Sequence, residues 1–221
     1  MKLDVAVNNC LKKIKSIDYL KKGSVGEQAV FSICECIYQE IGGILYHSYT
    51  YTADKDLAGN IKKGPNGLYL ESVGSTTEID VLLVTPFRIF PIEVKTYKAK
   101  SITLTEDGIS GCFQDEKSPV HQNEMHCRHL YPQILAALPQ GRSEFIVPFV
   151  VFVDECTLHD KRSTWQREYI KATVLDRVRY EICQRNTPVD NRYKLDLNLL
   201  DNLLKEACTS SERKLPVREI I

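Results

Sequence analysis

The hydrophobic positions near the start of the chain follow a helical period. Apolar residues recur every three or four positions over residues 1–20 and again over residues 24–41. This spacing puts apolar side chains on one face of a helix, so we predict two amphipathic helices, the first of which ends at Gly23. Ser24 is a suitable N-cap for the second helix, Glu27 follows three residues later, and a Gly-Gly pair marks the end.

The pattern then changes to short runs of β-branched, aromatic and apolar residues, which predict strands. A polar stretch with glycines over residues 52–66 predicts a loop, and an Asp-Gly pair at 107–108 predicts a hairpin turn. Several strands therefore lie together in this part of the chain. They cover residues 44–51, two apolar runs within residues 77–99, and residues 102–105 and 109–113.

The second half of the chain has fewer signals. Ser118 followed by Pro119 predicts the start of a helix that continues to about residue 138, with a bend at Pro132. Residues 145–153 are almost wholly apolar, as in a strand covered on both faces, and leucines over residues 199–207 predict a closing helix. This order of elements predicts an α/β sandwich in which helices flank a mixed sheet.

Three charged residues, Asp80, Glu93 and Lys95, interrupt the apolar runs of two neighbouring predicted strands. Burying an ionised group costs several kcal/mol unless the group is paired or holds a metal. Side chains alternate along a strand, so Glu93 and Lys95 lie on the same side of theirs. A hairpin that turns symmetrically about residues 86–87 would bring Asp80 directly opposite Glu93.

Two opposed carboxylates destabilise a sheet, but a divalent cation between them reverses that effect. Two carboxylates, waters and a substrate phosphate suit Mg²⁺, for which Mn²⁺ can substitute. Lys95 would then orient the nucleophile or offset charge in the transition state. We therefore predict a site for phosphodiester hydrolysis in which Asp80 and Glu93 are metal ligands.

A purely structural interpretation of the same residues is also open. Asp80 and Glu93 could each form a salt bridge, for example with Lys95 and Arg88, on a partly exposed sheet face. Pro91 adds an expected irregularity just before Glu93, because proline donates no hydrogen bond to a neighbouring strand.

Composition narrows the possible partners. Lys+Arg and Asp+Glu both number 29, so the chain is formally neutral and would need a local basic patch to hold a polyanion. The start of the chain lacks the apolar core of a signal peptide, and no run approaches the about 18–20 apolar residues that span a bilayer, so we predict a cytoplasmic protein.

Cysteine and histidine usage argues against a zinc module. Eight scattered cysteines without a Cys-x-x-Cys pair predict reduced thiols, not a zinc ribbon or a disulfide scaffold. One cluster resembles metal ligands but lacks the second spaced pair of a structural zinc site, and it consists of His121, His126, Cys127 and His129.

Three segments, "GSVGEQAV", "TEID…PIEVKTYKA" and "SPVHQNEMHCRHL", occur in this order and resemble the nuclease-related domain family, NERD, of the PD-(D/E)xK nuclease superfamily. The resemblance covers residues 23–138 best and implies a restriction-endonuclease-like core over residues 23–221, preceded by an extra helix at residues 1–22. It also implies Mg²⁺-dependent cleavage of DNA, with Asp80 and Glu93 as metal ligands and Lys95 as the catalytic lysine.

The resemblance implies two more site residues. Glu27 matches an acidic residue of the family's first helix, where it would help to bind the metal or hold its water. Gln122 matches a glutamine on the helix after the core strands, which would reach the active site. Each has a structural alternative: Ser24 and Glu27 also form a capping-box pattern, and Gln122 could be a solvated polar residue. Ser118 stands where family members often have asparagine.

A neutral protein needs a local positive rim to hold phosphates. Each candidate lysine or arginine could instead be an ordinary surface residue. No recognition helix or RNA-stacking motif is evident, so we expect cleavage of low sequence specificity. The candidates are Lys62, Lys63, Lys98, Lys100 and Arg128.

Three functional hypotheses follow from the sequence. The first is a metal-dependent DNA nuclease, in defence against foreign DNA or in DNA processing, that works alone, as a homo-oligomer or beside a separate partner such as a helicase. The second is a non-catalytic module that keeps the fold and binds nucleic acid or a partner. The third is a hydrolase of a small phosphodiester or nucleotide, which would have a closed pocket.

Overall fold

The computed structural model describes residues 19–52, 76–97, 99–106, 108–111, 118–188 and 193–218. A seven-stranded mixed sheet forms its centre, in the order β10-β1-β2-β3-β6-β8, with β9 also paired to β1. The strands are β1 (Gly43–Thr52), β2 (Thr76–Val84), β3 (Ile89–Lys95), β6 (Phe149–Phe152), β8 (Lys171–Val174), β9 (Cys208–Ser210) and β10 (Arg213–Arg218). Strands β3, β6 and β8 are parallel, whereas β1, β2 and β3 are antiparallel.

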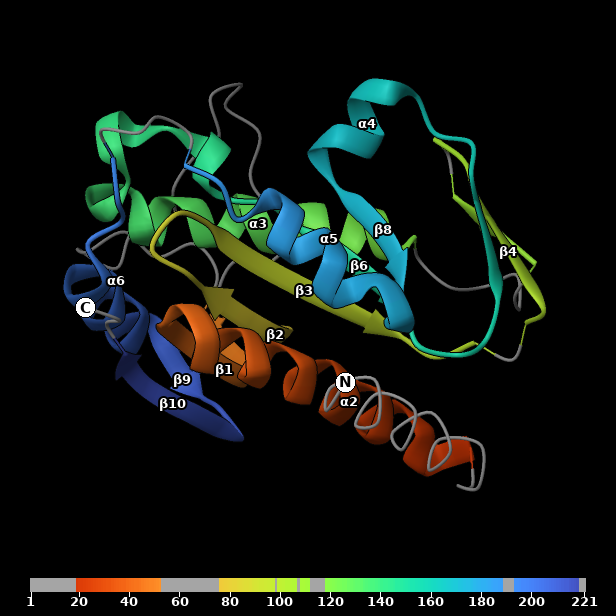
Figure 1. Ribbon diagram of the computed structural model, residues 1–221, viewed down its shortest axis with the longest axis horizontal. Coiled ribbons are helices and arrows are strands. Elements are labelled where there is room, and N and C mark those ends of the chain that lie inside the picture. Colours follow the sequence, from red (N-terminus) through yellow and green to blue (C-terminus); the bar gives the residue numbers. More distant parts are fainter. Residues whose placement is uncertain are drawn as a thin grey trace.

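Helices cover both faces of this sheet. Residues of α2 and α5 share one buried apolar cluster with the sheet, and residues of α3 and α6 share another. Figure 1 shows α2 and α5 in front of the sheet and α3 behind it. The predicted α/β sandwich is therefore confirmed, whereas the restriction-endonuclease-like core stays a prediction. The helices are α2 (Tyr19–Ile41), α3 (Pro119–Ile134), α4 (Thr164–Tyr169), α5 (Val178–Arg185) and α6 (Leu197–Ala207), with short 3₁₀ turns at Leu135–Ala137, Pro139–Gly141, Ser143–Phe145 and Leu175–Arg177.

The hairpin of β2 and β3 has the register that the sequence predicts. The Thr85 amide donates a hydrogen bond to the Arg88 carbonyl, and pairing then runs in step from Val84 with Ile89 outward. Pro91 pairs with Leu82 without a shift. The last pair is Val81 with Ile92, so Asp80 and Glu93 are the next residues on the two strands.

Alternation along β2 breaks at Asp80, which the sequence pattern does not predict. Ile79 packs with α3 and α6, whereas Val81, two residues later, packs with α2 on the opposite face. In a regular strand these two side chains would share a face. On the adjacent strand β1, Ser48 has a positive φ of 52°. The β1 residues directly before and after Ser48 pair with Val81 and Ile79 of β2. The irregularity thus spans both strands at the level of Asp80.

A second, three-stranded sheet lies beside the first, in the order β5-β4-β7. It contains β4 (Ser101–Leu104), β5 (Ile109–Ser110) and β7 (Thr157–Asp160). The predicted hairpin is confirmed, because β4 and β5 are antiparallel and the Thr105 amide donates to the Gly108 carbonyl. The parallel partner β7 comes from a region without a clear secondary-structure pattern in the sequence.

Two local predictions need correction. Helix α2 begins at Tyr19 and runs through Gly23 and Ser24, so Ser24 is inside the helix and cannot form a capping box with Glu27. The helix does end before the Gly-Gly pair, where Gly42 has a φ of 75°. The predicted strand at 145–153 is shorter, because a 3₁₀ turn occupies its start.

Several predictions fall outside the described residues. They include residues 1–18 of the predicted first helix and most of the predicted loop over residues 52–66. Within the described part of the chain, no helix is long and apolar enough to cross a bilayer. The six cysteines described there are free thiols, in line with the prediction.

Candidate active site

Strand β3 carries two of the three charges at its carboxyl end. Glu93 is 2% exposed, and its Oε1 lies 2.8 Å from the Nζ of Lys95, which is partly exposed. Both residues occupy alternate positions of one strand, so they point to the same side, as the sequence predicts. The buried acid and the amine therefore form a direct ion pair.

Asp80 reaches the same strand end from β2. Its Oδ2 accepts a 2.7 Å hydrogen bond from the backbone amide of Val94, the residue between Glu93 and Lys95. The carboxylate thus takes a backbone donor of β3 just beyond the last β2–β3 pair. This contact explains why the regular ladder stops at Val81, and it fixes the Asp80 side chain at the carboxyl end of β3.

The two acids have pKa values that differ from their ordinary range. Burial raises the pKa of Asp80 well above its usual value, and the nearby Glu93 carboxylate raises it further, although the Val94 hydrogen bond opposes this. Burial also raises the pKa of Glu93, against the effect of Lys95. Among the described residues, Lys95 is the one cation that lowers these pKa values, so the pair has a deficit of positive charge.

Helix α2 brings a third acid to this region. A Cβ on Gly26 would lie 2.9 Å from Thr96 Oγ1 and 3.2 Å from Val153, so glycine lets the helix approach the ends of β3 and β6 closely. Glu27 follows and is partly buried. Burial raises its pKa, the carboxylates of Glu78 and Glu212 add to the shift, and Lys95 opposes it. Glu27 therefore belongs to the same electrostatic cluster, without a hydrogen bond to Asp80 or Glu93 among the described residues.

His126 is a neighbour of Glu93 that the sequence did not assign to this site. Its Nε2 lies 3.6 Å from Glu93 Oε2, a distance too long for a hydrogen bond. The imidazole is buried, and burial lowers its pKa to about 4, so it is neutral at pH 7. The sequence held one indication that His126 could lie at this site: it follows Gln122 by four residues, and residues four apart share a helix face.

The neighbour of Gln122 forms hydrogen bonds from α3 to two strands of the sheet. Asn123 is buried, and its Nδ2 donates to the carbonyls of Pro91 and Phe149 at 3.3 and 2.6 Å. It thereby ties α3 to both β3 and β6. The Gln122 side chain is partly buried and forms no hydrogen bond with the described residues, so its role in the site stays a prediction.

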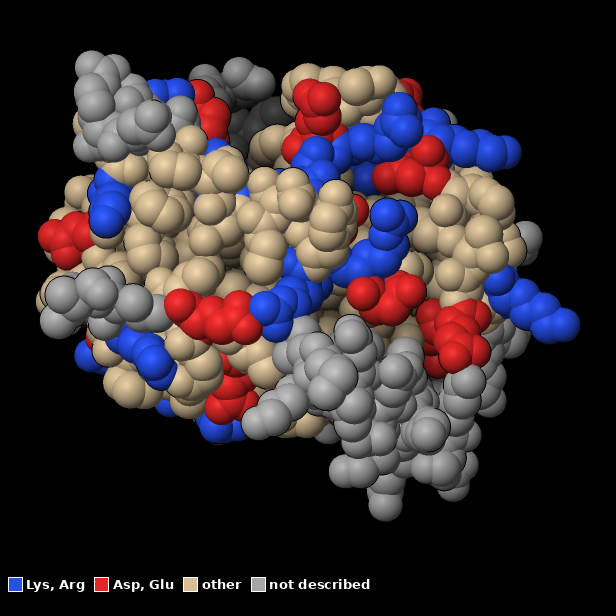
Figure 2. All heavy atoms as spheres, viewed as in Figure 1, with Lys and Arg blue, Asp and Glu red and all other residues tan. Residues whose placement is uncertain are grey.

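The predicted basic rim is only partly described. Lys62, Lys63 and Lys98 lie outside the described residues. Lys100 is exposed, and Arg128 is exposed and paired with Glu124 at 2.6 Å. Acidic and basic side chains are interspersed on the face shown in Figure 2, without a broad basic area there.

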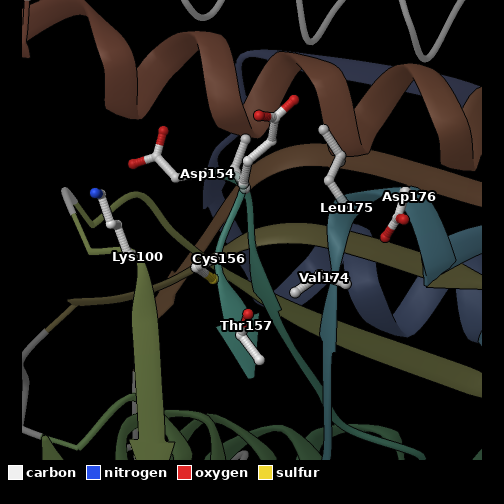
Figure 3. A pocket seen from close by; sticks show the side chains of 9 residues that line it. Lys100, Asp154, Cys156, Thr157, Val174, Leu175 and Asp176 are labelled. Carbon is white, nitrogen blue, oxygen red and sulfur yellow. The ribbon is translucent and has the colours of Figure 1, made fainter. Parts of the chain in front are cut away.

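A hollow of about 390 Å³ lies past the carboxyl ends of β6 and β8. Lys100 and Asp154 line one side and Asp176 the other, below α2 (Figure 3). Its wall begins at Val153, whose amide donates to the Lys95 carbonyl, so it adjoins the end of β3. The hollow is open to solvent, and its charged lining residues are three acids and one lysine, which does not match the closed pocket expected for a small-phosphodiester hydrolase.

The donor set can be compared with the needs of Mg²⁺. Within the described residues, no group of three or more His, Cys, Asp or Glu side chains is arranged to hold a metal, and this includes the histidines and cysteine considered for zinc. Asp80 and Glu93 nevertheless supply two hard carboxylates, and Lys95 is the cation of the described residues that opposes their raised pKa values. Mg²⁺ commonly uses one or two protein carboxylates and completes its shell with waters and phosphate oxygens, so the pair fits this ion.

The fold and the site together define an α/β protein with two acids and a lysine at the end of a central strand. Comparison with protein families gives the particular group: the model of the nuclease-related domain, NERD, matches residues 22–153. The match covers more than half of the 221 residues, so the chain belongs to this family and the predicted resemblance is confirmed. Comparisons with curated proteins and with solved structures gave no match.

Proposed function

We propose that this protein is a Mg²⁺-dependent nuclease that hydrolyses phosphodiester bonds in DNA with low sequence specificity. Membership of the nuclease-related family supports a nuclease-related function. The observation that carries the proposal is the pair of the partly buried Asp80 and the buried Glu93, whose pKa values are raised and are both opposed by Lys95. A structural salt bridge needs no second acid at that position.

Each residue has a defined task in this reaction. Asp80 and Glu93 would hold the metal, which when bound supplies a Lewis acid for the phosphate and lowers the pKa of a coordinated water. Asp80 is held for this by the Val94 amide and Glu93 by Lys95. Lys95 Nζ, which is partly exposed, can donate to the attacking water and offset negative charge in the transition state.

Three further residues would support this centre. We assign Glu27 to hold water at the edge of the site, since its carboxyl responds to Lys95 without a direct bond to it. His126 would restrict Glu93 from the α3 side. Gln122 lies one turn before His126 and would meet the substrate from the same helix face.

The test is metal-dependent cleavage by the purified chain. Linear, circular and single-stranded DNA are incubated with Mg²⁺, Mn²⁺ or EDTA, and we expect products only with a divalent ion. Lys95→Ala should reduce the cleavage rate by roughly 10²–10³-fold, the usual effect of removing one preorganised charge-stabilising group. Lys161→Ala, which changes an exposed lysine outside the site, is the matched control. Equal cleavage by Lys95→Ala and the control would refute the proposal.

A non-catalytic binding module is the second candidate. The lack of a third protein ligand close to Asp80 and Glu93 among the described residues favours it. It predicts that DNA binds to the protein equally well with and without metal and is never cleaved. The same incubations distinguish the two candidates, because only the nuclease would give cleavage products when a divalent ion is present.

A further inference from the structure

An exposed aromatic pair stands out on the surface beside α3. Trp165 and Tyr169 lie on α4 and are 71% and 41% exposed. Their rings stack with centroids 5.7 Å apart and planes only 11° from parallel. A single exposed aromatic residue needs no explanation, but adjoining exposed aromatic residues form an apolar patch of the kind found at binding sites. The pair therefore offers a flat surface, which we call the aromatic platform.

The platform borders a pocket with unused hydrogen-bonding groups. The pocket holds about 310 Å³ and is lined by both aromatic residues and by Arg162 and Gln166. Arg162 is 3% exposed; Asp160 and the Ile170 carbonyl hold its other nitrogens, but its Nη1 has no partner among the described residues. The buried Gln166 Oε1 likewise has none there. Buried polar atoms are costly when unpaired, so a donor and an acceptor at one pocket indicate a ligand.

The chemistry of the pocket favours a nucleobase. A base presents a flat π face to aromatic rings and both donors and acceptors along its edge, which match Arg162 Nη1 and Gln166 Oε1. Glu106 and Glu124 also line the pocket and would repel a phosphate. A neutral base can enter while its phosphates stay outside. Bases in a duplex are stacked and paired, so only an unpaired base offers its face and edge together.

The position of the pocket connects it with the proposed reaction. Helix α3 contributes His121 and Glu124 to the pocket, while His126 of the same helix contacts Glu93. A strand bound at the platform would therefore pass beside the helix that borders the carboxylate pair. From this arrangement we infer that the aromatic platform and its pocket bind an unpaired base of single-stranded nucleic acid. The inference rests on the proposed function only in naming the strand form of the substrate.

Trp165 is the single tryptophan of the chain, so intrinsic fluorescence reports directly on the platform. The full chain is titrated in EDTA with a 20-nucleotide single-stranded DNA, the matching RNA, and the blunt DNA duplex. We expect quenching by a single strand and little change with the duplex. Quenching by either single strand supports the inference, and the tighter one identifies the preferred sugar. No quenching by either, or equal quenching by the duplex, overturns it.

A second measurement uses labelled single strands and fluorescence anisotropy with variants. Trp165→Ala should raise the Kd by roughly 5- to 150-fold, the range for loss of one base–aromatic stack. Gln166→Ala should raise it less, since it removes one hydrogen bond. Tyr180→Ala is the control, because Tyr180 is 58% exposed on α5 and does not line the pocket. Equal binding by Trp165→Ala and Tyr180→Ala refutes the platform.

These outcomes are separable from the proposed function. The titrations contain no divalent ion and measure binding alone. If Trp165→Ala binds normally while Lys95→Ala loses metal-dependent cleavage, the platform is refuted and the nuclease stands. If the platform binds single strands but no cleavage occurs with metal, the platform stands and the proposed nuclease function is refuted.

Discussion

Two buried acid clusters in this protein have opposite electrostatics. Glu93 and Asp201 are nearly equally buried, at 2% and 5% exposure. Burial acts to raise the pKa of Asp201, but hydrogen bonds from Lys205 and Lys214 outweigh it and lower the pKa. The pKa values of Glu93 and Asp80 are instead raised.

The number of cations explains the difference. At Asp201, two lysines meet one carboxylate and join α6 to β10. At the end of β3, one lysine serves two carboxylates, with Glu27 adding further negative charge. Among the described residues, the first cluster thus has two cations for one acid, whereas the second has one cation for two acids. Burial of charge alone therefore does not indicate a functional site, whereas burial with raised acid pKa values makes the end of β3 the candidate site.

The largest expected effect tests the cluster at the end of β3. Asp80→Asn should reduce Mg²⁺-dependent cleavage by roughly 10²–10³-fold, because it removes a ligand charge. In metal-free buffer at pH 7 the same change should raise the free energy of unfolding by about 1 kcal/mol, because the raised pKa means that the ionised carboxyl costs stability. Urea unfolding and a cleavage assay measure both.

Adding Mg²⁺ gives the control for Asp80→Asn. A bound ion should raise the melting temperature of the wild type but not that of the variant. If Asp80→Asn is instead less stable than the wild type without metal, the comparison between the two clusters fails.

The next effect separates stability from activity on α3. Asn123→Ala should lower the free energy of unfolding by about 1–3 kcal/mol, since it removes two buried hydrogen bonds from α3 to the carbonyls of β3 and β6. Gln122→Ala, one residue earlier, should leave stability nearly unchanged and reduce the cleavage rate. Urea unfolding and cleavage rates of both variants decide this. A stability loss in Gln122→Ala comparable with that of Asn123→Ala would make Gln122 a structural residue.

The Asp201 cluster predicts a pH-dependent effect. Asp201→Asn should lower the free energy of unfolding by about 1–3 kcal/mol at pH 7, because it removes charged hydrogen bonds. The folded pKa of Asp201 is depressed, so its contribution is fully present above the unfolded pKa of about 3.9 and is lost as the pH falls through the folded pKa. The difference in free energy of unfolding between wild type and variant, measured by urea unfolding, should therefore shrink below about pH 4. A constant gap from pH 7 to pH 3 would contradict it.

The smallest effect tests how α2 approaches the site. Gly26→Ala should cost about 1–2 kcal/mol, because the added methyl meets Thr96 and Val153 and this outweighs the better helix propensity of alanine. Gly108→Ala is the matched control, since its Cβ would meet nothing within 4 Å. Thermal unfolding of both variants measures the difference. Equal melting temperatures would mean that α2 is not tightly packed at Gly26.

Much of the site was predictable because it depends on local rules. Alternation along β3 and the turn at residues 86–87 place Glu93, Lys95 and Asp80 at one strand end, and the structure agrees up to the last pair. What failed was the helix start at Ser24, because a capping pattern is a local signal and α2 continues through it from Tyr19. The pairing of β7 with β4 and of β9 and β10 with β1 joins residues far apart in sequence, which no local pattern records.

The sequence by itself determined the mixed α/β class, the β2–β3 register, the family and the three charged residues, because these follow from periodicity, turn chemistry and short motifs. Only the tertiary structure decided that Asp80 accepts from the Val94 amide, that His126 faces Glu93, and that Trp165 and Tyr169 border a pocket where a donor and an acceptor have no partner in the described part of the chain. These contacts join separate elements, and their energies depend on burial and neighbouring charge, which exist only once the sheet and its helices have packed.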